Sequence, residues 1–135
     1  MAYCTHSDIA KTAPEEDLIA LTDDEKLGVA NEERITGAIE RADSLIDAYC
    51  RQAYGVPFTP VPELIKSLSA DIALYNLYTR KVDAVPEARS QRYRDALSVL
   101  DAIAKGTMPL PLAGNGGPES SAAEKVFTDE GLGGY

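Results

Sequence analysis

The sequence contains little of what most enzyme sites and metal sites are built from. It has no tryptophan, one histidine and two cysteines, and only 7% of its residues are aromatic. A structural zinc site needs several cysteine or histidine ligands at matching spacing. Phosphate-binding and dinucleotide-binding glycine motifs are also missing, because the glycines at 114–117 lack a preceding strand and a following helix. We therefore expect no enzyme, no cofactor and no catalytic or metal-binding residues.

Long hydrophobic runs are absent as well. No segment approaches the roughly 20 apolar residues of a membrane span, and the first residues lack the basic start and apolar run of a signal peptide. We expect the chain to be made in the cytoplasm, with Cys4 and Cys50 reduced rather than joined in a disulfide. The lone His6 lies two positions before Asp8 in the sequence, and we expect it to be a surface residue.

Acidic residues outnumber basic ones, and the formal net charge is −9. Residues 1–33 hold nine acids and two bases, for −7; residues 34–105 hold nine acids and ten bases, for +1; residues 106–135 hold four acids and one base, for −3. An acidic surface repels phosphate, which argues against a general nucleic-acid binder. It remains compatible with DNA passing nearby, since a negative wall would keep DNA from sticking.

The last thirty residues have the composition of an arm. Residues 106–135 contain seven glycines and three prolines. Such a segment cannot bury enough apolar surface to offset its ordering entropy, and it becomes ordered when something else holds it. We therefore divide the chain into a folded domain at 1–105 and an extended C-terminal arm at 106–135 that lies on a neighbouring molecule.

Apolar residues recur at helical spacing through the first half of the folded domain. Residues 5–27 read as short helical pieces. Asn31 can cap a long helix that runs to about residue 53, because apolar residues repeat there at steps of three and four. Gly55 is expected to stop this helix. A stiff proline-rich connector follows at 56–62.

Two further helices are predicted at 62–81 and 86–106. The first is apolar on more than one face, so it is either central in the domain or in contact with a second subunit. Asp71 interrupts its apolar surface and could pair with an arginine inside the bundle or across an interface. No segment alternates with period two. The predicted fold is all-α: a small bundle of three main helices, short N-terminal helices and the C-terminal arm.

Basic residues gather near the turn between the last two predicted helices. They form either a solvated basic end or a docking patch for an acidic neighbour, such as residues 1–33 of an identical subunit in a head-to-tail ring. Four tyrosines of the two central helices and the connector are expected to pack in the core with their hydroxyls at its edge; one or two of them could instead lie in an interface, where tyrosine is common. The candidate interaction residues are Arg80, Lys81, Arg89, Arg92 and Arg94, with Leu110, Leu112, Val126, Phe127 and Tyr135 of the arm. The tyrosines are Tyr49, Tyr54, Tyr75 and Tyr78.

Short pieces of sequence in a fixed order give a resemblance over residues 3–112. They are Leu18 to Thr22, Ala38-Ile39, Ala42, Ile46-Asp47-Ala48-Tyr49, Tyr54-Gly55-Val56-Pro57-Phe58, Pro62-Glu63-Leu64, Asp71-Ile72-Ala73-Leu74-Tyr75, Leu77, Arg92-Tyr93, Ala96, Leu100, Ile103-Ala104, Gly106 and Leu110-Pro111-Leu112. In this order and spacing the chain resembles a family of small proteins from Mu-like bacteriophages and prophages. Residues 113–135 carry no signal of that family.

The resemblance implies a virion structural protein without catalytic residues. The family looks like the helical head–tail connectors, or adaptors, of long-tailed phages. These form a ring, usually of about twelve subunits, beneath the portal protein, and they join the head to a tail-side connector or tail-terminator protein. DNA passes through the channel without specific binding. A C-terminal arm that docks on the portal would account for the composition of residues 106–135.

Three other interpretations remain open from the residues alone. A small helical DNA-binding regulator could use Arg89, Arg92 and Arg94 to contact phosphates, although the net charge opposes it. An enzyme or small-molecule carrier would need a deep pocket with converging polar groups. A tail terminator or stopper would fit the same particle, but those proteins are mostly built from strands.

Overall fold

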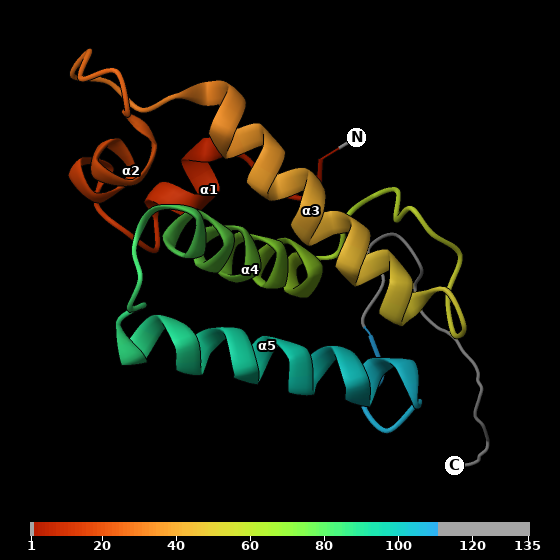
Figure 1. Cartoon of the computed structure of the whole chain (residues 1–135). Helices are drawn as coiled ribbons and strands as arrows, with labels where there is room; N and C mark the ends of the chain where they lie inside the picture. The colour runs from red at the N-terminus through yellow and green to blue at the C-terminus, as the bar shows by residue number, and fades with distance from the viewer. Residues whose placement is uncertain (1, 111–135) are drawn as a thin grey trace, which may run out of the picture. The chain divides into compact units, whose positions relative to one another are not determined.

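Five helices make up the part of the chain that the structure describes, residues 2–110 of a computed structural model. Figure 1 shows their order along the chain. Residues 2–110 contain no strand, so the predicted all-helical domain with three main helices is confirmed. The helices are α1 (His6–Ala10), α2 (Glu15–Thr22), α3 (Glu32–Cys50), α4 (Glu63–Lys81) and α5 (Glu87–Ala104).

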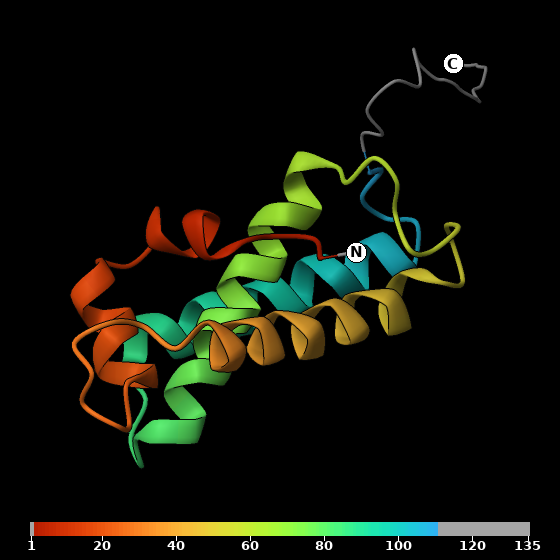
Figure 2. The same ribbon diagram turned by 90° about the horizontal axis from the view of Figure 1, so that it is seen from above.

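α4 is the central helix. It packs against α1, α2, α3 and α5. It lies between α3 and α5 in Figure 1, and it crosses both of them when seen from above in Figure 2. Its apolar residues on several faces are therefore covered within one chain, which confirms the first of the two predicted roles for this helix. The buried residues of α4 are Ile65, Leu68, Ser69, Ala70, Ile72, Ala73, Leu74 and Leu77.

Four of the helices begin next to short polar side chains or prolines. Thr5 caps α1 in a capping box with Asp8, in which each residue's side chain accepts from the other's backbone N–H. The Asn31 side chain caps α3 by accepting from the backbone N–H of Arg34 at 3.0 Å. Pro14 and Pro86 occupy the N-cap positions of α2 and α5.

Helix ends were harder to predict. α3 ends at Cys50, about three residues before the predicted end. There the backbone N–H of Ala53 donates to the carbonyl of Cys50, three residues back, and departs from the four-residue spacing of the helix. α5 ends at Ala104 in a Schellman motif. There Gly106 has a φ of 78° and donates to Ile103, and the next backbone N–H donates to Ala102.

A hydrogen-bonded cluster holds the first residues against α3 and α4. The backbone N–H of Tyr3 donates to Asp43 at 2.9 Å, and its hydroxyl donates to Asp47. Ser69 Oγ lies 2.7 Å from Asp43 Oδ1 and 3.2 Å from Cys4 Sγ. Since a hydroxyl carries one proton, the shorter contact identifies Asp43 as the acceptor. The cluster ties three segments together at one partly buried carboxylate.

Both thiols are free, and both are buried. Burial raises the pKa of Cys4 to about 11, and the nearby charge of Asp43 adds to the shift. Burial likewise raises the pKa of Cys50 to about 11, with help from the nearby charge of Asp47. Both groups are therefore protonated and unreactive at neutral pH.

The four predicted core tyrosines are all half-buried, which agrees with packing at the edge of the core. Tyr75 of α4 stacks on Tyr93 of α5, with ring centroids 3.9 Å apart and ring planes 10° from parallel. This stacked pair joins the central helix to the last helix.

All five helices belong to one compact unit, formed by residues up to 57 and residues 63–109. Phe58 and Leu110 belong to a second unit, and both side chains are buried. The predicted arm at 106–135 falls mostly outside the described residues, so the division at residue 105 stays a prediction. Among residues 2–110, no helix combines the length and the apolarity needed to cross a bilayer.

Candidate functional site

Two of the predicted docking residues already have a partner in their own chain. At the end of α4, Arg80 Nη2 donates to Asp24 Oδ2 at 2.7 Å, and Lys81 Nζ lies 2.8 Å from Asp24 Oδ1. Arg80 Nη1 also donates to the carbonyl of Leu21 at 2.7 Å. The acidic N-terminal segment therefore meets the basic end of α4 within one subunit, where the sequence suggested a contact between two subunits.

Arg34 of α3 extends this group. It makes two parallel hydrogen bonds to the carboxylate of Glu25, at 2.8 and 2.9 Å, and it donates to the carbonyl of Thr22 at 2.9 Å. Hydrogen bonds from Arg80 and Lys81 hold the pKa of Asp24 well below its ordinary value. We call Asp24, Glu25, Arg34, Arg80 and Lys81 the Asp24 cluster; it attaches the segment after α2 to α3 and α4.

Two of the three arginines of α5 also pair with carboxylates of the same chain. Arg92 Nε lies 3.2 Å from Asp71 Oδ1 on α4, and Arg94 donates to Glu87 at 2.6 Å. Burial raises the pKa of Asp71, and the charge of Arg92 opposes the shift. Asp71 thus pairs with an arginine inside the bundle, which was one of the two predicted arrangements. Arg89 is half-exposed near the start of α5.

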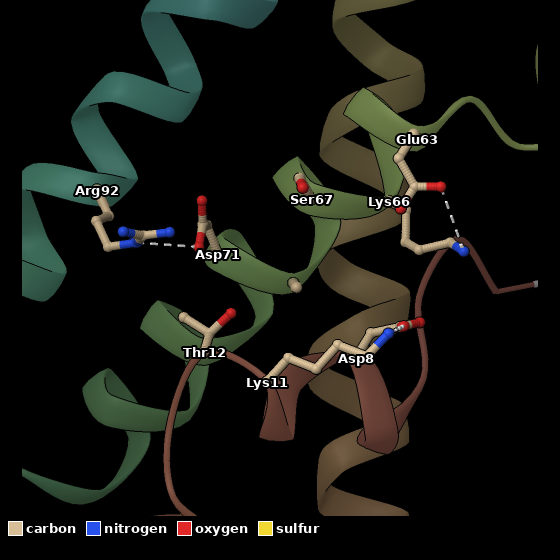
Figure 3. A pocket seen from close by; sticks show the side chains of 9 residues that line it. Asp8, Lys11, Thr12, Glu63, Lys66, Ser67, Asp71 and Arg92 are labelled. Atoms are coloured by element: carbon tan, nitrogen blue, oxygen red, sulfur yellow. Dashed lines mark hydrogen bonds and ion pairs between the residues drawn. The ribbon is translucent and has the colours of Figure 1, made fainter.

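A small pocket of about 130 Å³ lies over the Asp71–Arg92 pair. Figure 3 shows Arg92 pointing at Asp71, Lys66 turned to Glu63 and Lys11 beside Asp8. Three cations therefore face three carboxylates. The remaining lining residues are Thr12, Ser67 and Ala70.

This pocket offers weak support for catalysis. Its charged side chains are paired with each other, and none of its lining residues is a histidine or a cysteine that could serve as base or nucleophile. Among residues 2–110, no three side chains of the metal-ligating types gather in a way that could hold an ion.

The loop between α2 and α3 carries a surface that sequence reasoning missed. Leu27 and Val29 are 73% and 61% exposed, the highest values among large apolar side chains of the described residues. The Asp23 carboxylate accepts from the backbone N–H groups of Leu27 and Gly28, at 2.8 and 2.7 Å. Lys26 and Gly28 both have positive φ. The sequence signal that could have predicted this exposed surface is Gly28 between the apolar Leu27 and Val29 in an acidic segment.

His6 joins three helices. Its Nε2 lies 2.8 Å from Glu15 of α2, and its Nδ1 contacts Glu32 of α3. Because each ring nitrogen faces a carboxylate, both must carry a proton for both hydrogen bonds to form. Partial burial lowers the pKa of His6, but the hydrogen bonds to Glu32 and Glu15 outweigh it and raise the pKa overall. His6 is thus a structural link as well as a surface residue.

Comparison of the sequence with models of known protein families identifies the family of this chain. A sequence model of the family described as Bacteriophage Mu, Gp36 matches residues 3–129. The chain belongs to this family. No curated protein matches the sequence.

Membership of the Gp36 family confirms the resemblance to proteins of Mu-like phages at the level of the family. The match covers all five helices and therefore every contact described above. It also extends beyond residue 112, where the sequence suggested that the family signal ends.

The apolar candidates of the arm are placed only in part. Leu110 is buried, with 6% of its surface exposed. The other four, Leu112, Val126, Phe127 and Tyr135, lie outside the residues that the structure describes.

Proposed function

We propose that this Gp36-family chain is a virion structural protein that joins the phage head to the tail. In this proposal it forms a ring of identical subunits beneath the portal protein and contacts a tail-side connector or terminator on the other side. The observation that carries the proposal is the match of residues 3–129 to a phage protein family, combined with a small all-helical domain. The chain would be made in the host cytoplasm and end up in the virion.

The charge distribution supports a role next to DNA without tight binding. The chain has a formal charge of −9, and seven units of it arise in residues 1–33. Only some of these acidic side chains form ion pairs: Asp24 and Glu25 are paired with arginines, while Glu16 and Glu33 are exposed. Exposed acids of this kind would repel the phosphates of DNA that moves through a channel.

The alternative of a DNA-binding regulator loses support. Two of its three expected phosphate-binding residues, Arg92 and Arg94, already face carboxylates of the same chain. Phosphate binding would have to break these pairs, in a protein whose net charge opposes the approach of DNA. We likewise propose a non-catalytic role, because the pocket over Asp71 offers paired charges and no activated nucleophile.

A nonsense mutation in the gene for this chain tests the proposal in a phage that carries it. We expect DNA-filled heads and complete tails to accumulate separately, and addition of the purified chain to the mixed lysate to restore infectious particles. The same lysate with buffer alone is the control. Normal particle yield from the mutant would overturn the proposal.

The position in the particle is tested separately. If the chain carries an affinity tag, electron microscopy of purified virions should show a gold-labelled antibody against the tag at the head–tail junction. Chemical cross-linking should join the chain to the portal protein. A chain that is absent from virions, or cross-linked only to tail-tube proteins, would contradict the adaptor position. The second result would favour a terminator instead.

A further inference from the structure

The apolar loop, residues 23–30, is held rigidly although two of its large side chains face solvent. Asp23 fixes the backbone of Leu27 and Gly28, and the Asp24 cluster fixes the residues before them. The loop projects beyond the start of α3 in both ribbon views (Figures 1 and 2). A preformed loop loses little conformational entropy when it docks, so its exposed apolar side chains are suited to insertion into a partner.

A shallow hollow on the outer face of α3 offers a surface of the right kind. We call it the α3 hollow; its lining residues are Gly37, Glu40, Arg41, Ser44 and Leu45. A Cβ built on Gly37 would meet nothing within 4 Å, so the surface above this glycine is open. Glycine is unfavourable inside a helix, and here no contact within the described chain requires it. Close approach of another molecule would account for it.

Charge favours a second copy of this chain as the occupant. The apolar loop is bordered by Asp23, Glu32 and Glu33. Arg41 is the one cation of the α3 hollow, and Glu40 next to it is the one carboxylate. Within residues 2–110 Arg41 forms no ion pair. The acidic rim of the loop can therefore pair with Arg41, while the apolar side chains of the loop reach Gly37 and Leu45.

We propose that the apolar loop of one subunit packs into the α3 hollow of the next, with Leu27 and Val29 over Gly37 and Glu33 near Arg41. This inference rests on the proposed ring, because it names the contact between its subunits. The two surfaces consist of different residues, so the contact is head-to-tail and can repeat around a ring.

Cross-linking between two variants that each carry one added cysteine tests the pairing directly. Full-length Val29→Cys and Ser44→Cys chains are mixed and treated with a short bis-maleimide; native Cys4 and Cys50 are buried. We expect a cross-linked dimer in the mixture well above the yield of either variant alone. The matched control replaces Ser44→Cys with Ala88→Cys, at an exposed position of α5. The pairing would be overturned if the Val29→Cys/Ser44→Cys pair and the Val29→Cys/Ala88→Cys pair gave equal yields of cross-linked dimer, both in a concentrated solution of the protein and in phage particles.

Self-association of the full chain gives a second readout. Leu27→Asp should weaken it by about 30-fold or more if Leu27 is a central anchor, as measured by analytical ultracentrifugation over a range of concentrations. Val82→Asp is the control, because Val82 is also exposed but lies outside both surfaces. Equal effects of the two variants would contradict the inference.

These results separate the inference from the proposed function. If Leu27→Asp leaves head–tail joining intact while deletion of the gene abolishes it, the function stands and the loop contact fails. If the cross-link forms but the chain is absent from virions, the loop contact stands and the function fails.

Discussion

At the scale of single residues, a few polar side chains connect segments that are far apart in the sequence. His6 links α1 to α2 and α3. Ser69, which is fully buried, links α4 to Asp43 and thereby to the first residues of the chain. A hydrogen bond to a buried group matters mainly through the cost of leaving that group without a partner. Single substitutions at these positions should therefore cause measurable changes in the free energy of unfolding.

Replacement of His6 should change how stability depends on pH. The pKa of His6 is raised in the folded chain, so its contribution is fully present below about pH 6.5 and is lost as pH rises through the folded-state pKa. We expect His6→Gln to lower the free energy of unfolding by up to about 1 kcal/mol at the acidic end and by less in alkaline solution. Urea unfolding at several pH values measures this. A deficit that grows with pH would contradict the role of the two carboxylates.

Replacement of Ser69 should destabilise the fold at all pH values near neutrality. Ser69→Ala removes the hydroxyl that donates to the partly buried carboxylate of Asp43, at a cost of about 1–2 kcal/mol. Ser67→Ala, on the exposed side of the same helix, is the matched control and should change little. Chemical denaturation compares them, and equal midpoints for the two variants would rule out the proposed importance of the cluster.

At the scale of helices, the ends depend on local backbone chemistry. Asn31 and Thr5 begin helices because their side chains satisfy backbone N–H groups that have no helical partner. Gly106 ends α5 because it adopts a positive φ that other residues adopt only at a cost. Gly37, in contrast, lies inside α3 in open surroundings, so the two glycines should respond oppositely to the same substitution.

Alanine at the two glycines tests this difference. Gly106→Ala should lower the free energy of unfolding by about 1 kcal/mol, since the Cβ disfavours positive φ. Gly37→Ala should raise it by up to about 1 kcal/mol in the monomer, because alanine is the better helix former and its Cβ meets no atom. Thermal and urea unfolding of dilute protein measure both. Effects of the same sign would contradict the assignment of the α5 end.

At the scale of the whole molecule, the core lies around α4 and the acidic N-terminal segment is attached to it. The Asp24 cluster and the Tyr3–Asp43 contact hold that segment within the chain. The two cations at the end of α4 are therefore already paired with Asp24 of the same chain. The contact that we propose between subunits therefore uses the apolar loop and the α3 hollow rather than these cations.

Removal of the arm should separate folding from docking. A chain that ends at Leu110 retains all five helices and the core around α4, so we expect its unfolding midpoint to stay within a few degrees of the full chain. If the arm docks on the portal, this truncated chain should fold yet fail to join heads to tails in the complementation assay. Normal joining by the truncated chain would exclude a docking role for the arm.

Much of the fold followed from periodicity along the sequence. The stripes of apolar residues predicted three long helices, and Asn31 predicted the start of one of them. The apolar character of residues 62–81 on several faces predicted a helix that is either central or in contact with a second subunit. These features depend on neighbours within a few positions, so a linear sequence records them. The early end of α3 was missed because Gly55 was expected to stop the helix, whereas the turn already begins at Cys50.

Tertiary structure alone decided which charges meet. The sequence showed acids in residues 1–33 and bases near the end of α4, but Asp24 and Arg80 are 56 positions apart and either could have paired with another copy. It also decided that Leu27 and Val29 face solvent. The physical reason is that composition and spacing determine which residues form helices, whereas the packing of those helices brings distant side chains together or leaves them exposed.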